Sequence, residues 1–163
     1  MADFERAHAF IYPSEKGLSN SASDRGGETN HGISQKAFPN LDIKNLSYES
    51  AKKLAFECYW KRYRINEITS QPIATFIYDM IFNMDYDDAV KAIQRAVGGI
   101  KVDGVMGSVT IAAINSCQNL DWLLDRIFKE RMRVYLLILD RLPNQAVNMR
   151  SWMRRSLRDY KTV

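Results

Sequence analysis

Hydrophobic and polar residues alternate along most of the chain with the 3.6-residue period of an α-helix. The clearest apolar stripe follows Pro72, a residue that favours a helix start, and contains Ile73, Phe76, Ile77, Met80 and Ile81. The same spacing predicts helices over residues 3–13, 48–64, 72–82, 87–97, 109–116, 121–142 and 146–160. Because no period-2 alternation occurs outside residues 15–34, we expect a mainly α, helical-bundle fold with a small β-hairpin or loop near the N-terminus.

Four signals set the predicted helix ends. Pro13 interrupts the first helix, because proline lacks the backbone N–H that the helical ladder needs. Ser47 and Ser108 are expected to cap the helices that follow them. Gly98-Gly99 is a natural stop for the helix that precedes it.

Residues 15–34, E-K-G-L-S-N-S-A-S-D-R-G-G-E-T-N-H-G-I-S, are too rich in glycine and turn-forming polar residues for a regular helix. Two carboxylates, Glu15 and Asp24, and one hydroxyl, Thr29, lie in this stretch. Two carboxyl groups can divide general acid and general base work when their surroundings separate their pKa values. For Asp24 a turn-forming role alone is the alternative.

This stretch resembles the signature of glycoside hydrolase family 108, the N-acetylmuramidases of phage endolysins and bacterial secretion activators. The signature reads roughly E-G-G-x-x-N followed by D-x-G-G-x-T-N-x-G-I-S. The chain departs from it at Lys16, and Pro13 lies unusually close before it. The matching residues are Glu15, Gly17, Asn20, Asp24, Gly26, Gly27, Thr29, Asn30, Gly32, Ile33 and Ser34.

The resemblance implies a lysozyme-like α+β fold and hydrolysis of the β-1,4 bond between N-acetylmuramic acid and N-acetylglucosamine. By the same likeness, Glu15 is the general acid, Asp24 the base and Thr29 the residue that orients the attacking water. Because a water must fit between the two carboxyls, we expect inversion, with the carboxyls roughly 6.5–9.5 Å apart. Asn30 and His31 are candidate saccharide contacts, and no metal or cofactor is expected.

A second resemblance lies in the C-terminal half. The pattern Q-x-x-L/V-G…D-G-x-x-G-x-x-T of peptidoglycan-binding modules is matched by Gln94, Asp103, Gly104, Gly107 and Thr110. Asp103 is therefore a candidate substrate contact, although the pattern is equally typical of a structural turn between packed helices. We expect a catalytic lobe over residues 1–84 and a helical peptidoglycan-binding-like lobe over 85–163, packed as one unit because no Pro-, Gly- or Ser-rich linker separates them.

Charge and composition limit the kinds of partner that we expect the chain to bind. The chain has 163 residues, 46% hydrophobic and 26% charged, with a net charge of +4. From Arg126 onward the sequence contains ten basic and three acidic residues. This excess of positive charge suits binding to an anionic cell wall, or is simply that of a helix face exposed to solvent. The resemblance implies bacterial peptidoglycan as the partner, and we expect a monomer. Because the sequence has no nucleic-acid-binding motif and no run of ~18 apolar residues, we expect neither nucleic acid as a partner nor stable membrane insertion. The N-terminus lacks a signal-peptide pattern, so we expect cytoplasmic synthesis and release to the wall by a holin or an export route.

Three other functions compete with the muramidase interpretation. A zinc amidase or endopeptidase needs several His, Cys or Asp ligands, and the chain has two isolated histidines. A Cys–His hydrolase needs an exposed thiol, whereas Cys58 falls on the apolar face of a predicted helix. The third is a non-catalytic peptidoglycan-binding or lysis-accessory protein, which has no need of an acid such as Glu15.

Overall fold

The computed structural model describes residues 1–12, 18–19 and 27–162, with the backbone alone for residues 18, 19 and 162. In this part of the chain the α-helices are α1 (Phe4–Ile11), α2 (Tyr48–Ala55), α3 (Gln71–Asn83), α4 (Tyr86–Val97), α5 (Ser108–Ser116), α6 (Leu120–Arg141) and α7 (Ala146–Thr162). A π-helical segment, η2 (Phe56–Lys61), directly follows α2. Two short 3₁₀ helices are η3 (Ile65–Glu67) and η4 (Pro143–Gln145). The mainly helical prediction is confirmed.

Side-chain caps explain most helix starts. Ser47, Ser70 and Asn119 each accept a backbone N–H from the first turn of the helix that follows. The predicted cap at Ser108 is wrong by one residue, because Ser108 already lies in α5 and Gly107 occupies the cap position. No side chain caps this helix; the backbone carbonyl of Gly107 accepts the N–H of Ile111.

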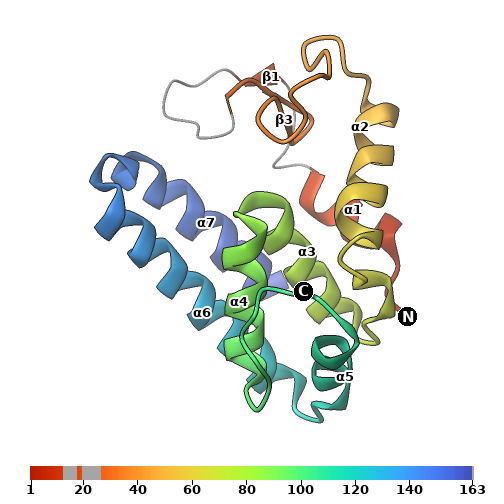
Figure 1. Ribbon diagram of the computed structural model, residues 1–163, viewed down its shortest axis with the longest axis vertical. Coiled ribbons are helices and arrows are strands. Elements are labelled where there is room, and N and C mark those ends of the chain that lie inside the picture. The colour runs from red at the N-terminus through yellow and green to blue at the C-terminus, as the bar shows by residue number, and fades with distance from the viewer. Residues whose placement is uncertain (13–17, 20–26, 163) are drawn as a thin grey trace.

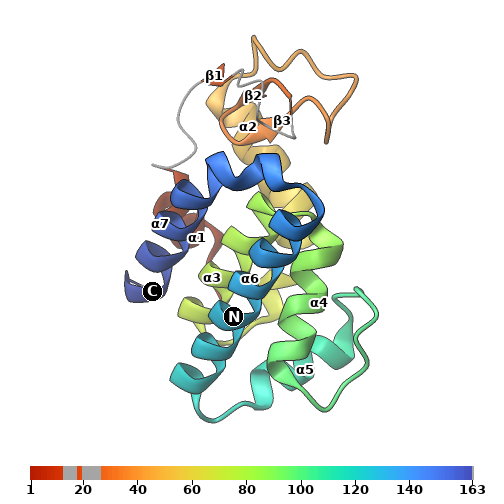
Figure 2. The same ribbon diagram turned by 90° about the vertical axis from the view of Figure 1, so that its left-hand side faces the viewer.

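Helix α3 forms the centre of the molecule (Figures 1 and 2). Each residue from Ile73 to Phe82 is buried, so this helix is covered on every side. Helix α1 packs on it from one side, and α4 and α6 from another. The core therefore includes residues from both halves of the chain.

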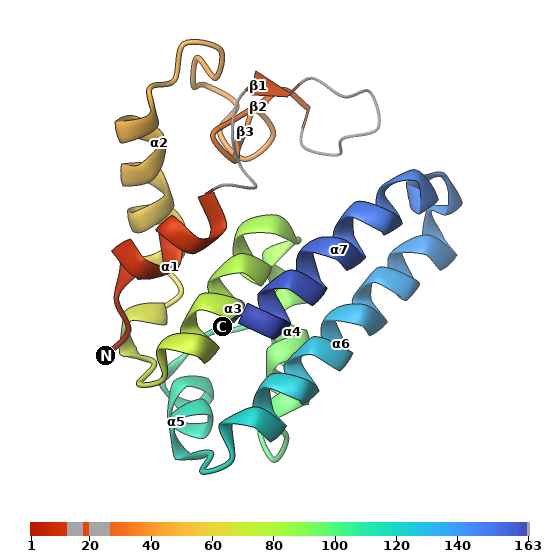
Figure 3. The ribbon, with the colours of Figure 1, turned by 180° about the vertical axis from the view of Figure 1, so that it is seen from behind.

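A small antiparallel sheet lies at one end of this helical body (Figure 3). Its strands, β1 (Leu18–Ser19), β2 (Thr29–Asn30) and β3 (Ile33–Ser34), are ordered β1-β2-β3, so the predicted hairpin is extended by a third strand. Leu18 pairs with Asn30, and Asn30 in turn pairs with Ile33. The connection between α4 and α5 lies at the opposite end of the molecule (Figure 1).

None of the helices described has both the length and the apolar character needed to cross a membrane.

Candidate functional site

The sheet and the turn between β2 and β3 hold three of the six residues that the sequence singles out. Thr29 and Asn30 form β2, and His31 is the first residue of the turn that leads into β3. Glu15 and Asp24 lie outside the described residues. Asp103 belongs to the α4–α5 connection, far from the sheet (Figure 1). The structure therefore brings Thr29, Asn30 and His31 together and separates Asp103 from them.

Thr29 is half-buried on the strand, and its backbone is fixed by neighbours on both sides. It pairs with Ser19 of β1 and with Ser34 of β3. Its hydroxyl donates a hydrogen bond of 3.3 Å to the carbonyl of Gly27. The hydroxyl oxygen keeps acceptor capacity, so this side chain can still receive a hydrogen bond from a water or a substrate.

Asn30 holds the sheet against the connector that precedes α2. Its side chain is 7% exposed, and Nδ2 donates to the carbonyl oxygens of Ile43, Lys44 and Leu46 at 3.0, 3.4 and 3.4 Å. The Ile43 carbonyl also accepts the N–H of Leu46, so the bonds from Asn30 add to the turn that this connector already forms. Asn30 thus has a structural role, whereas its contact with a saccharide stays a prediction.

His31 contacts two tyrosines that come from separate helical segments. Its Nδ1 lies 3.3 Å from the hydroxyl of Tyr12, which directly follows α1, and the two rings stack with centroids 6.2 Å apart. Tyr48, at the start of α2, packs 4.4 Å from Tyr12 and 5.9 Å from His31, measured between ring centroids. All three side chains are half-buried. We call these three residues the tyrosine–histidine cluster.

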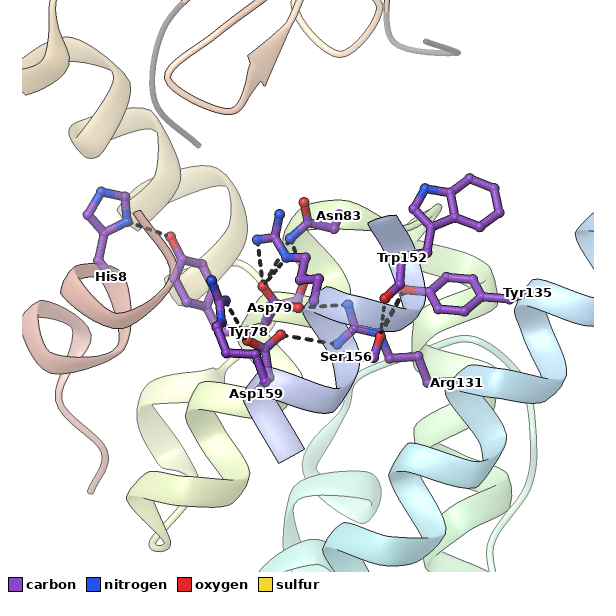
Figure 4. A network of polar contacts seen from close by, with 11 residues as sticks. His8, Tyr78, Asp79, Asn83, Arg131, Tyr135, Trp152, Ser156 and Asp159 are labelled. Atoms are coloured by element: carbon purple, nitrogen blue, oxygen red, sulfur yellow. Dashed lines mark hydrogen bonds and ion pairs between the residues drawn. The ribbon is translucent and has the colours of Figure 1, made fainter. Parts of the chain in front are cut away.

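His8 anchors this cluster to the core. Its ring lies 5.9 Å from Tyr12 and 6.1 Å from Tyr48, and its Nδ1 is 3.0 Å from the hydroxyl of Tyr78 in α3 (Figure 4). Burial, with a smaller effect from Lys52, lowers the pKa of His8 from 6.5 to about 4. His8 is therefore neutral near pH 7 and joins α1 to α3 as an uncharged hydrogen-bonding group.

Asp103 is part of a turn that is organised by Gln94. The Gln94 side chain is buried; Nε2 donates to Asp103 Oδ1 at 2.8 Å, and Oε1 accepts the N–H groups of Asp103 and Gly104. Nε2 also reaches the carbonyl of Val105 and the hydroxyl of Thr110. The bonds from Gln94 and Val105 lower the pKa of Asp103. The matched pattern thus builds a turn, and contact between Asp103 and substrate stays a prediction.

A buried ion network joins α3, α6 and α7 (Figure 4). It consists of Asp79, Arg131, Arg155 and Asp159. Arg131 Nη2 lies 2.7 Å from Asp79 Oδ2, and Nη1 lies 3.6 Å from Asp159 Oδ2. Arg155 donates to Asp79 Oδ1 at 2.7 and 2.6 Å. Burial alone would raise the pKa of Asp79, but the guanidinium groups of Arg155 and Arg131 lower it well below its usual range.

Sequence patterns missed both the tyrosine–histidine cluster and the buried ion network. Asp79 does carry a signal, because it is a charged residue inside the apolar stretch of α3. Arg131 carries a similar signal, since it lies four residues from both Ile127 and Tyr135 on the buried face of α6. Tyr12, His31 and Tyr48 have no such signal, because tertiary packing alone brings them together.

A helical body with a small antiparallel sheet at one end is a mainly α, lysozyme-like fold, as predicted. Residues 8–84 match the family model for glycosyl hydrolase 108, and residues 88–157 match that of a predicted peptidoglycan domain. The chain thus joins a glycosyl hydrolase 108 region to a predicted peptidoglycan domain, which confirms the resemblance inferred from the sequence. Together the two matches support a peptidoglycan hydrolase of the glycoside hydrolase class.

The fold has a counterpart among solved structures. The structure of Brucella abortus SagA superposes with a TM-score of 0.81 at 24% sequence identity, covering 97% of this chain and 91% of that one. At this identity the likeness concerns the fold. None of the curated proteins compared with the chain matches it.

Proposed function

We propose that the protein is an N-acetylmuramidase that hydrolyses the β-1,4 bond between N-acetylmuramic acid and N-acetylglucosamine in peptidoglycan. The observation that carries this proposal is the occurrence of Glu15, Asp24 and Thr29 within a chain that matches both a glycosyl hydrolase 108 model and a peptidoglycan domain model. A protein that only binds peptidoglycan needs no acid or base, so this set of residues favours catalysis over binding alone.

In the proposed mechanism Glu15 protonates the leaving glycosidic oxygen. Asp24 accepts a proton from a water that attacks the anomeric carbon from the opposite face of the sugar. Thr29 orients this water through its hydroxyl, which has acceptor capacity left beside its bond to Gly27. The bond to the leaving oxygen breaks as the bond to water forms, and the configuration inverts.

We place this activity in the bacterial cell wall, either in phage lysis or in opening the wall for protein export. The peptidoglycan domain match supports the wall as the place of action. From Arg126 onward, Arg131 and Arg155 belong to the buried ion network, but the exposed basic residues of the same stretch suit binding to the anionic polymers of the wall: Lys129, Arg133, Arg141, Arg150, Arg154 and Lys161.

Mass spectrometry of fragments released from purified sacculi tests the proposal. Wild-type protein is expected to release disaccharide muropeptides that end in reducing N-acetylmuramic acid, and Glu15→Gln is expected to release none. Glu28→Gln is the matched control, because Glu28 lies in the same segment and forms an ion pair of 3.8 Å with Lys44. It should retain activity.

Other products would contradict the proposal in identifiable ways. Fragments with reducing N-acetylglucosamine or 1,6-anhydro sugar ends would indicate a different cleavage of the glycan. Free peptides would indicate an amidase or endopeptidase. Binding to sacculi without any release would identify a non-catalytic peptidoglycan-binding protein.

A further inference from the structure

The outward face of helix α7 combines basic and apolar side chains. Residues 147, 150, 154, 157 and 161 follow one another at steps of three and four, the spacing that places side chains on one face of a helix. The acidic residue of α7, Asp159, is buried in the ion network on the other side. We call the exposed face the α7 surface stripe, and it consists of Val147, Arg150, Arg154, Leu157 and Lys161.

The positive charges of this stripe are not neutralised by neighbouring acids. Among the ion pairs of the described part of the chain, none involves Arg150, Arg154 or Lys161. On α6, by contrast, the exposed Lys129 lies 2.6 Å from the Asp125 carboxylate. The α7 surface stripe therefore presents its positive charge to solvent, where an anionic partner can reach it.

The apolar members of the stripe decide between the possible partners. Val147 is 71% exposed and Leu157 40%, and Met153 beside them is 41% exposed. An anionic polymer would pair with the bases and leave these apolar side chains in water. A second copy of the chain would cover them but would bring two positively charged faces together, which is unfavourable. The surface of an anionic bilayer has both phosphates for the bases and an apolar boundary for the other side chains.

We propose that the α7 surface stripe docks the protein on the surface of an anionic lipid bilayer. Helix α7 runs along the outside of the helical body (Figures 2 and 3), and its stripe extends over about 21 Å, so the whole stripe can touch a flat surface at once. Arginine and lysine hold phosphates while their carbon stems lie against the neighbouring valine and leucine. Val147 and Leu157 enter the boundary between headgroups and acyl chains.

Flotation of the protein with lipid vesicles tests this docking without reference to catalysis. Wild type should bind vesicles of equal parts phosphatidylglycerol and phosphatidylcholine roughly 100-fold more tightly than vesicles of phosphatidylcholine alone, because three bases contribute about fivefold each. Added salt should weaken this binding. Arg154→Gln should weaken it about fivefold. The double variant Val147→Ser/Leu157→Ser keeps every charge and should weaken it about tenfold. Because these positions are exposed, the melting temperatures should equal that of wild type.

Two matched controls lie away from α7 in the region of α5 (Figure 1). Lys101→Gln removes an exposed base and Val109→Ser an exposed valine, and neither should change vesicle binding. Equal binding to both kinds of vesicle, or binding to neither, would overturn the proposal. Full binding by Val147→Ser/Leu157→Ser with loss in Arg154→Gln would overturn it in favour of an anionic polymer. Sedimentation with sacculi and titration with duplex DNA would then identify that polymer. A wild-type dimer in analytical ultracentrifugation that Val147→Ser/Leu157→Ser abolishes would instead assign the stripe to a second copy.

Discussion

The buried ion network gives the strongest stability prediction, for the substitution Arg131→Met. Arg131 is fully buried, and its Nη2 lies 2.7 Å from Asp79, which is also fully buried. Its Nε donates to the Tyr135 hydroxyl at 2.9 Å, and its guanidinium lies 5.5 Å from the Phe76 ring centroid. Methionine keeps most of the apolar stem. The change therefore removes a charge and leaves much of the packing.

The expected cost follows from the groups left behind. Removing one partner of a buried ion pair costs about 3–5 kcal/mol, because the other charge remains in a medium of low dielectric constant. Arg155 still compensates Asp79 in part, so the lower end of this range is expected. For a chain of 163 residues, about 3 kcal/mol lowers the melting temperature by roughly 9 °C.

Urea denaturation followed by circular dichroism measures this effect. Arg133→Met is the matched control, because Arg133 lies on the same helix with its side chain 61% exposed and forms only a 3.7 Å ion pair with Glu130. It should change the free energy of unfolding by less than about 0.5 kcal/mol. A loss below about 1 kcal/mol for Arg131→Met would refute the reasoning, since Arg155 would then suffice to stabilise the Asp79 carboxylate.

Three further predictions concern other buried polar groups. His8 has a lowered pKa of about 4, so the unfolded chain binds more protons than the folded chain between about pH 6.5 and 4. The free energy of unfolding should therefore decline as pH falls through this window, by at most about 3 kcal/mol, and His8→Gln should remove this decline in urea titrations. Gln94→Ala breaks the bonds that organise the Asp103 turn and should cost about 2–4 kcal/mol, whereas the exposed Gln118→Ala should cost almost nothing; equal stability of the two would disprove this. Asn30→Ala removes the side-chain donor shared by three carbonyl groups, of which Ile43 keeps the N–H of Leu46, and should destabilise by about 1–3 kcal/mol. The exposed Asn144→Ala should have a negligible effect.

Helix positions could be predicted from the sequence because they depend on local signals. The apolar stripe of α3, the cap Ser47 and the helix-starting Pro72 lie within a few residues of the structure that they determine. The predicted cap at Ser108 was wrong because it rested on serine being a better cap by type. In the structure the Gly107 carbonyl accepts the N–H of Ile111, so the helix begins one residue earlier, at Ser108.

The candidate site was predictable only in part, for a physical reason. Thr29, Asn30 and His31 share one hairpin, so their proximity follows from the chain itself. The contacts of His31 with Tyr12 and Tyr48 depend on how two helices pack beside the sheet, which no periodicity encodes. The roles of Glu15 and Asp24 come from family resemblance and stay predictions, because both residues lie outside the described part of the chain.

The two matched regions share a core, and this predicts that residues 1–84 do not fold without the rest. Asp79 lies in the glycosyl hydrolase 108 region, whereas Arg131 and Arg155 lie in the peptidoglycan domain region. Cutting the chain after residue 84 would leave Asp79 without either guanidinium, which costs about 3–5 kcal/mol of stability. The cut would also expose apolar side chains of α3, and each of them would cost about 1.5–3 kcal/mol. These losses equal much of the 5–15 kcal/mol that stabilises a typical domain.

The isolated fragment 1–84 should therefore show no cooperative thermal transition, whereas the full chain should unfold in one transition. Adding fragment 85–163 should restore cooperativity if the shared core, and not some local fault of the fragment, is the cause. A fragment 1–84 that unfolds cooperatively on its own would show that the first region builds a sufficient core alone. The ion network would then join two independently stable units, and Arg131→Met would weaken their association without unfolding either one.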